Sequence, residues 1–222
     1  MSQTIKLTAA DGVTIDAYQA DPAGTPRGGL VVLQEIFGVN PHIRRVADGF
    51  AAEGYRVIAP ALFDRVKPGV ELDYTQDGMA AGIALMGQVD QEKALLDVAA
   101  AVKAAAAGGK VGVVGYCWGG SLAYAAACSG EGLAAAVGYY GGNIAKSLDR
   151  KPKVPLMLHF GERDSHIPMS DVDKIKAALP DVPVYTYDAD HGFNCDARGS
   201  YDKPSAATAL ERTLAFFARH LG

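Results

Sequence analysis

The feature of this 222-residue sequence that most constrains its fold is a series of short apolar segments without polar alternation. The segments are GGLVVLQE (28–35), YRVIAPA (55–61), KVGVVG (110–115), LAAAVGYY (133–140), VPLMLHFG (154–161) and VPVYTYDA (182–189). Strands that are apolar on both faces are typical of parallel sheets covered by helices on both sides. Apolar residues with helical spacing lie between them, for example Ile43, Val46, Ala47 and Phe50. We therefore expect an α/β fold with a mostly parallel, doubly wound sheet and helices on both faces.

Two stretches depart from this pattern. TIKLTAADGVTIDAYQA, residues 4–20, contains two alternating segments around Asp11-Gly12, a dipeptide that favours a tight turn, so we expect an N-terminal antiparallel hairpin. Residues 63–88 are the least periodic part of the chain and are interrupted by glycines. We interpret them as an excursion over the crevice at the carboxyl ends of the strands. The length favours a single domain, residues 1–222.

Charge and cysteine usage exclude several classes of protein. With 25 acidic and 21 basic residues the net charge is -4, and no stripe of lysine and arginine could follow nucleic-acid phosphates. The amino terminus lacks the pattern of a leader peptide, and no apolar run reaches the length of a membrane span. Cys117, Cys128 and Cys195 are odd in number and lack C-x-x-C spacing, which argues against a disulfide framework. We expect a cytoplasmic protein that binds neither nucleic acid nor a membrane.

The segment GYCWG, residues 115–119, has the form G-x-nucleophile-x-G. It lies between the predicted strand KVGVV and the small-residue helix GGSLAYAAAC, which places Cys117 in a sharp strand-to-helix turn. The amino terminus of that helix favours the thiolate form of the cysteine. Cys117 is therefore a candidate nucleophile, although the turn taken alone is equally consistent with a small buried cysteine that only fills space.

A candidate acid and a candidate base follow at later strand ends. Asp164 comes after LMLHFG, and His191 comes after VYTYDAD. The order of nucleophile, acid and histidine would bring three loops to one edge of the sheet. We expect His191 to take the thiol proton or to hold it as imidazolium, and Asp164 to fix the tautomer through the other ring nitrogen. Asp188 and Asp190 compete with Asp164 as the orienting acid.

Further candidates surround this constellation. The backbone N–H groups of Trp118 and Ile36 are the expected oxyanion hole. Glu35 precedes Ile36 at the end of a strand and could contact Cys117 or the substrate. Phe37 and Tyr139 could line the pocket, although aromatic residues at strand ends are more often part of the core.

Four segments, QEIFGVN, GYCWGG, GERDSHIP and HGFNCDARGSY, together resemble the dienelactone hydrolase family, a cysteine-nucleophile branch of the α/β-hydrolases, over essentially the whole chain. The resemblance implies an α/β-hydrolase fold and a triad of Cys117, Asp164 and His191. It also implies that Glu35 holds the resting thiol until substrate displaces it, and then accepts the thiol proton. The implied reaction is attack on a lactone carbonyl, formation of a thioester acyl-enzyme and release of a ring-opened acid, which is maleylacetate in the best-known members.

The arginines depart from the family pattern. Members that act on dienelactone bind the substrate carboxylate with two arginines, one before the nucleophile and one shortly after the histidine. Here residues 66–109 contain no arginine, and Arg198 lies seven residues after His191. Arg198 or Arg65 could bind the carboxylate, but neither is a residue-by-residue match. Hydrolase chemistry is therefore better supported than dienelactone specificity.

Other functions are weighed against this hypothesis. A broad carboxylesterase has the same triad with another substrate, and a non-catalytic ligand-binding or thiol-sensing protein could share the fold. No phosphate-binding glycine motif is present. The only ligand-like spacing near the candidate triad is H-x-x-x-C at 191–195, so we expect neither a metal nor a cofactor. The expected partner is a small lactone or ester, and the chain is expected to be a monomer or a small homo-oligomer.

Overall fold

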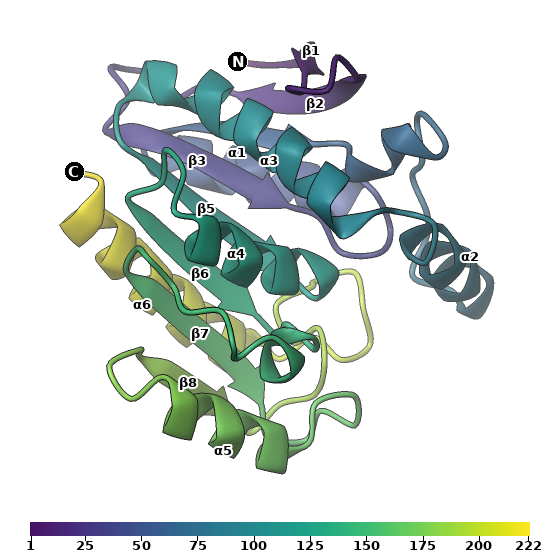
Figure 1. The fold of residues 1–222 in the computed structure, drawn as a ribbon, viewed down its shortest axis with the longest axis vertical. Coiled ribbons are helices and arrows are strands. Elements are labelled where there is room, and N and C mark those ends of the chain that lie inside the picture. Colours follow the sequence, from purple (N-terminus) through teal and green to yellow (C-terminus); the bar gives the residue numbers. More distant parts are fainter.

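The computed structural model describes residues 1–222 and contains one eight-stranded sheet, with the strand order β1-β2-β4-β3-β5-β6-β7-β8 (Figure 1). The strands are β1 Ser2–Thr8, β2 Thr14–Ala20, β3 Gly28–Leu33, β4 Tyr55–Pro60, β5 Val111–Tyr116, β6 Ala135–Tyr139, β7 Leu156–Gly161 and β8 Val184–Tyr187. Each predicted apolar segment coincides with one of the strands from β3 to β8, and only β5 extends beyond its segment, by one residue to Tyr116. The strands from β3 to β7 are almost entirely buried, because helices cover both faces of the sheet.

The predicted hairpin at the amino terminus is confirmed. β1 and β2 pair antiparallel, from Ser2 opposite Ala20 to Thr8 opposite Thr14, and β2 pairs antiparallel with β4. All the remaining strand pairs are parallel. The parallel strands therefore end at one edge of the sheet, and the loops that follow them lie together there.

Six α-helices pack around the sheet or project from it: α1 Pro41–Ala52, α2 Gln76–Met86, α3 Gln91–Ala105, α4 Trp118–Ser129, α5 Met169–Ala178 and α6 Lys203–His220. Side-chain caps fix the starts of several of them, as Asn40 does for α1 by accepting from the N–H of Ile43. The helices α3, α4 and α5 cover one face (Figure 1), and α1 and α6 meet on the other face, where Phe50 packs edge-on against Phe217. The predicted fold class is confirmed.

The aperiodic segment 63–88 lies over the carboxyl ends of the strands, as predicted. Its main element is α2, which projects from the body of the molecule in Figure 1. The helix approaches the loop after β3 very closely, because a Cβ atom on Gly82 would lie only 2.1 Å from the carbonyl oxygen of Ile36. Gly82 therefore allows a helix to pack directly on the backbone of a predicted oxyanion-hole residue.

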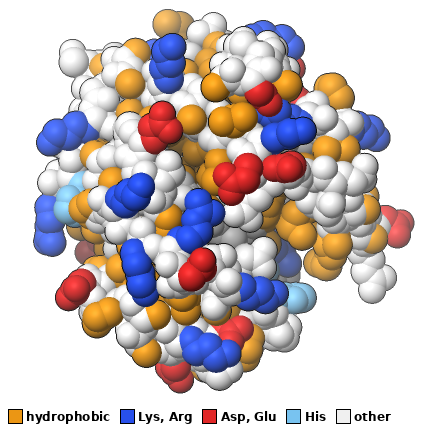
Figure 2. Space-filling view, viewed as in Figure 1, with side chains coloured by type: hydrophobic (Ala, Val, Ile, Leu, Met, Phe, Trp, Pro, Cys, Tyr) orange, Lys and Arg blue, Asp and Glu red, His pale blue; other side chains and the backbone are white.

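The surface shows no strong segregation of charge on the face drawn in Figure 2, where Lys and Arg side chains are interspersed with Asp and Glu. Mixed charges of this kind give that face no extended field of one sign. None of the helices has both the length and the apolar character needed to cross a membrane.

Candidate active site

Cys117 occupies a strained turn between β5 and α4. Its backbone has φ 56° and ψ -115°, a conformation that non-glycine residues rarely adopt. The flanking glycines make the turn possible: a Cβ on Gly115 would lie 1.9 Å from the carbonyl oxygen of Gly119, and one on Gly119 would lie 2.4 Å from that of Leu33. The turn therefore holds the cysteine at the amino terminus of α4, with the backbones packed too closely for larger residues on either side.

The structure brings Cys117, His191 and Asp164 together from the loops after β5, β8 and β7. Nε2 of His191 lies 3.2 Å from Sγ of Cys117, and Nδ1 lies 2.6 Å from Oδ2 of Asp164. The competing acids have other contacts, since Asp188 pairs with Arg163 and Asp190 accepts from the backbone N–H of His191. Asp164 is thus the acid that contacts the imidazole ring.

The environment of His191 favours its charged form. Burial lowers its pKa, but the hydrogen bonds with Asp164 and Cys117 outweigh that effect and raise the pKa to about 10. Oδ1 of Asp164 also accepts from the backbone N–H groups of His166 and Ile167, at 2.8 and 3.2 Å. These bonds fix the carboxylate beside the imidazole ring, so a proton that His191 takes from Cys117 is stabilised on the ring.

Two backbone donors near Cys117 have no acceptor. The N–H groups of Ile36 and Trp118 donate to no backbone or side-chain acceptor, and both residues line a cavity together with Cys117. The Trp118 N–H belongs to the first turn of α4, where N–H groups have no partner within the helix. The indole ring of Trp118 stacks on the ring of Phe63, with 5.2 Å between the ring centroids, and Trp118 lines the cavity.

The cavity beside Cys117 has a volume of about 340 Å³. Met79, Ile83 and Met86 of α2 form an apolar wall, and Phe37 and Arg198 also line the space. The sequence predicted Phe37 and Arg198 here, but it did not predict which side chains of the segment 63–88 would face the cavity. A cavity of this size, lined by the basic side chains of Arg198 and Lys146, suits a small substrate.

Two predicted substrate-binding residues lie elsewhere, and those predictions are wrong. The Arg65 guanidinium is bound by Asp97 at 2.6 Å and by Asp11 at 2.7 Å, outside the cavity. Tyr139 is fully buried and exchanges a 2.7 Å hydrogen bond with Thr213. Arg65 is held by its ion pair with Asp97 of α3, and Tyr139 is packed in the core, so neither side chain can reach a substrate.

Glu35 is fully buried and does not hydrogen-bond to Cys117 in this structure. Its Oε2 accepts a 2.7 Å hydrogen bond from Tyr74, and its Oε1 lies 3.7 Å from Nη1 of Arg198. The contact with a resting thiol that the family resemblance implies is therefore absent, because the thiol contacts His191. Tyr74 was missed by the sequence analysis, since it lies in the segment 63–88, where no periodicity marks side chains that point inward.

A parallel sheet, a strained nucleophile turn and a histidine and an acid from later strand ends are the features of an α/β-hydrolase. The profile of the dienelactone hydrolase family matches residues 15–221, and the chain belongs to that family. Carboxymethylenebutenolidases from Pseudomonas putida and Pseudomonas sp. strain P51 are 34% and 33% identical to it, over 98% and 99% of this chain and 97% and 96% of theirs.

Solved structures agree with this assignment. A crystal structure from Klebsiella pneumoniae, whose name places it with the dienelactone hydrolases, has a TM-score of 0.84 and 29% identity, with 99% of both chains covered. A dienelactone hydrolase-like promiscuous phosphotriesterase from metagenomic libraries has a TM-score of 0.79 at 22% identity, covering 100% of this chain and 99% of the other, and shows the shared fold. The protein is thus a hydrolase that acts on small molecules.

Proposed function

We propose that the protein hydrolyses lactones or esters through a triad of Cys117, His191 and Asp164. The continuous contact from Sγ of Cys117 to Nε2 of His191, and from Nδ1 of His191 to the Asp164 carboxylate, carries the proposal. Membership of a family whose curated relatives are named carboxymethylenebutenolidases supports the reaction class.

The chemistry divides into acylation and deacylation. In acylation the Cys117 thiol passes its proton to His191, and the sulfur forms a bond to the carbonyl carbon. The imidazolium of His191 then protonates the departing alkoxide, which in a lactone stays attached as the opened ring. In deacylation His191 takes a proton from water, the hydroxide attacks the thioester, and the thiolate of Cys117 leaves.

The negative charge of both tetrahedral intermediates develops on the former carbonyl oxygen. We propose that the N–H groups of Ile36 and Trp118 bind this oxygen, because they lack other acceptors and line the cavity with Cys117. Preorganised donors of this kind need no rearrangement as the charge forms, so the positions of the two backbones decide much of the rate.

The proposed substrate is a small lactone or ester that carries a carboxylate. Arg198 is the basic group for that carboxylate: it lines the cavity, and the Glu35 carboxylate lies 3.7 Å from its guanidinium. A substrate carboxylate would compete with Glu35 for Arg198, and Glu35 supports the site by holding that arginine in place. The apolar wall from α2 also suits uncharged esters, which is the alternative of a broader carboxylesterase.

The test combines trapping of the intermediate with a comparison of substrates, in metal-free buffer. Mixing the protein with p-nitrophenyl acetate and quenching it with acid should add one acetyl group to the peptide that contains Cys117, and the label should disappear as hydrolysis proceeds. The Cys128→Ala variant is the control and should be labelled like the wild type. A stable label on another residue, or turnover without any label on Cys117, would contradict the thioester mechanism.

The same samples identify the substrate class. Hydrolysis of cis- and trans-dienelactone with a higher kcat/KM than p-nitrophenyl acetate supports an anionic lactone. If only the simple ester is cleaved, still through Cys117, the anionic lactone is ruled out as the substrate and the protein is a carboxylesterase.

The close packing of α2 on Ile36 should make Gly82→Ala strongly deleterious. A Cβ at this position would lie 2.1 Å from the Ile36 carbonyl oxygen, so the helix and the proposed oxyanion-hole backbone must move apart. Because a displacement of about 1 Å at a reacting site can cost on the order of 10²-fold, we expect a fall in kcat of that order. Gly87→Ala, whose nearest atom is 3.5 Å from the new Cβ, is the matched control. Equal kcat values for the two variants would show that α2 does not position Ile36.

A further inference from the structure

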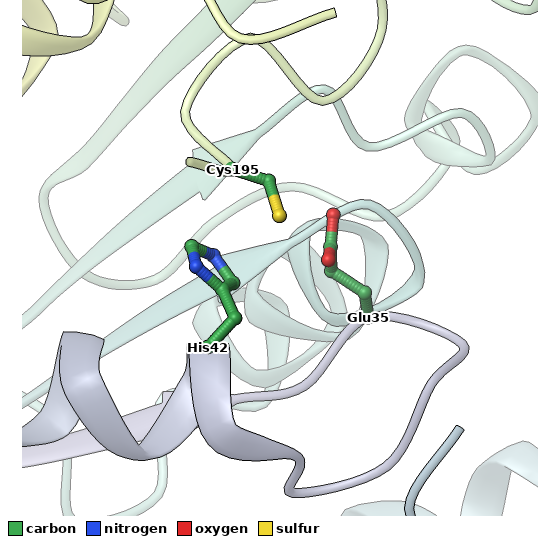
Figure 3. A group of neighbouring side chains, drawn as sticks. All are labelled: Glu35, His42 and Cys195. Carbon is green, nitrogen blue, oxygen red and sulfur yellow. The ribbon is translucent and has the colours of Figure 1, made fainter. Parts of the chain in front are cut away.

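A second group of ligand-type side chains lies near the triad but does not include it. Figure 3 shows Glu35 on the loop after β3, His42 in the first turn of α1 and Cys195 on the loop after β8, with their ends directed toward one another. One ligand atom from each residue lies within 4.8 Å of the other two. All three side chains are buried, with exposures of 0%, 4% and 0%.

Two atoms of this cluster lack partners, although burial makes an unpaired polar atom costly. Oε1 of Glu35 and Nε2 of His42 have no hydrogen-bond partner, and the Arg198 guanidinium lies 3.7 Å from Oε1 as an ion pair. The other polar atom of each side chain does have a partner. Tyr74 donates a hydrogen bond to Oε2 of Glu35, and Nδ1 of His42 lies 2.9 Å from Oδ1 of Asp196. In the neutral imidazole this arrangement puts the proton on Nδ1 and leaves a lone pair on Nε2.

A histidine whose Nδ1 is bound by a carboxylate while Nε2 is free has the arrangement that orients metal-ligating histidines. The set of a thiol sulfur, an imidazole nitrogen and a carboxylate oxygen suits Zn²⁺ and similar divalent transition metals, and does not suit Mg²⁺ or Ca²⁺. We propose that Glu35, His42 and Cys195 bind one such ion, with Cys195 as thiolate and its proton released to solvent.

The spacing of the three ligands fits this proposal. Bonds of about 2.0–2.3 Å in a tetrahedron place ligand atoms roughly 3.3–3.6 Å apart, so the side chains need to move inward by roughly 1 Å from their present limit of 4.8 Å. His42 also borders a cavity of about 540 Å³ beside α1 and α6, whereas Glu35 and Cys195 do not line it. No motif in the sequence marks this set, and the expectation was of no metal, because its members come from three separate segments.

A bound ion would join two of the loops that carry the candidate active site, those after β3 and β8. Glu35 directly precedes Ile36, and Cys195 lies four residues after His191. Cys117 and His191 are not ligands in this arrangement, so failure of the metal proposal leaves the proposed hydrolysis standing, and the reverse also holds. Glu35 is the shared residue, because a bound ion would take its Oε1 from Arg198.

The experiment uses a full-length protein in which Cys195 is the only thiol, made by Cys117→Ser and Cys128→Ser. It is loaded with Co²⁺ alone, both by direct addition and by refolding from denaturant, and its fold is checked by circular dichroism. We expect one equivalent of cobalt, one proton released per ion and a thiolate-to-cobalt charge-transfer band. Because this protein retains Cys195, the result does not depend on the folding of a ligand variant.

Ligand variants then assign the site. In the same background, His42→Gln should weaken cobalt binding by on the order of 10²-fold, whereas His220→Gln, at a histidine outside the cluster, should leave it unchanged. The proposal is overturned if the protein with Cys195 alone binds no cobalt with a charge-transfer band, if His42→Gln has no effect, or if binding requires Cys117.

Discussion

Replacement of Cys117 by alanine is expected to reduce kcat/KM for esters and lactones by on the order of 10⁴-fold or more. Alanine preserves the strained turn and adds no bulk, but it removes the atom that forms the thioester. The remaining backbone donors of Ile36 and Trp118 could still stabilise an oxyanion, so the residual rate should exceed that in water. Steady-state kinetics with p-nitrophenyl acetate measure the loss.

Cys128→Ala is the matched control for this variant. Cys128 is a buried thiol in α4 that contributes to the core. Its removal should cost some stability and leave kcat/KM nearly unchanged. If Cys117→Ala retained a tenth or more of the wild-type rate, Cys117 would be a packing residue and the proposed mechanism would be wrong.

Removal of the Arg65 side-chain charge should produce the largest loss of stability. The Asp97 side chain is fully buried in α3, and its hydrogen bonds come from Arg65, whose side chain is 8% exposed. Arg65→Met leaves that carboxylate buried and uncompensated, which should lower the free energy of unfolding by about 3–5 kcal/mol and Tm by roughly 6–20 °C. Thermal and urea unfolding at neutral pH measure both.

The double variant Arg65→Met/Asp97→Leu is expected to recover most of this loss, because the unpaired charge has been removed. Lys174→Met breaks an exposed pair with Asp171 instead and should cost no more than about 1 kcal/mol. If Arg65→Met lowered the free energy of unfolding no more than Lys174→Met, the buried pair of Arg65 and Asp97 would contribute little to stability.

The loss caused by Arg65→Met should also depend on pH. Burial raises the pKa of Asp97, and Arg65 opposes that rise, so its removal raises the pKa further. A raised carboxyl pKa in the folded state means that folding takes up a proton as the pH falls. The stability deficit should therefore be largest at neutral pH and shrink under acidic conditions.

The sequence predicted those parts of the structure that are determined by residues close together in the chain. The central strands were recognisable because strands buried on both faces contain few polar residues, and Cys117 was recognisable because only glycines tolerate the crowding beside its turn. The positions of Asp164 and His191 followed from chain order, since parallel strands end at one edge of the sheet.

The errors and omissions depend on distant partners. Arg65 looked available for a substrate carboxylate because nothing near it in sequence shows that Asp97 of α3 binds it. Tyr139 and Phe37 are both aromatic residues near strand ends, and only distant contacts distinguish them. Thr213 of α6 bonds to Tyr139 in the core, whereas Phe37 lines the cavity. The contact between Tyr74 and Glu35 could not be predicted, because it joins a strand end to an aperiodic segment.

Two sets of residues on α2 have separate roles. Gly82 lies against the backbone of Ile36 and Gly78 against that of Asp73, just before the helix, while Met79, Ile83 and Met86 line the cavity. Anchoring is thus assigned to residues without side chains, and substrate contact to residues with long, adaptable ones. Substitutions at the three cavity side chains can therefore change which substrates fit, while the contact of Gly82 with the Ile36 backbone stays as it is.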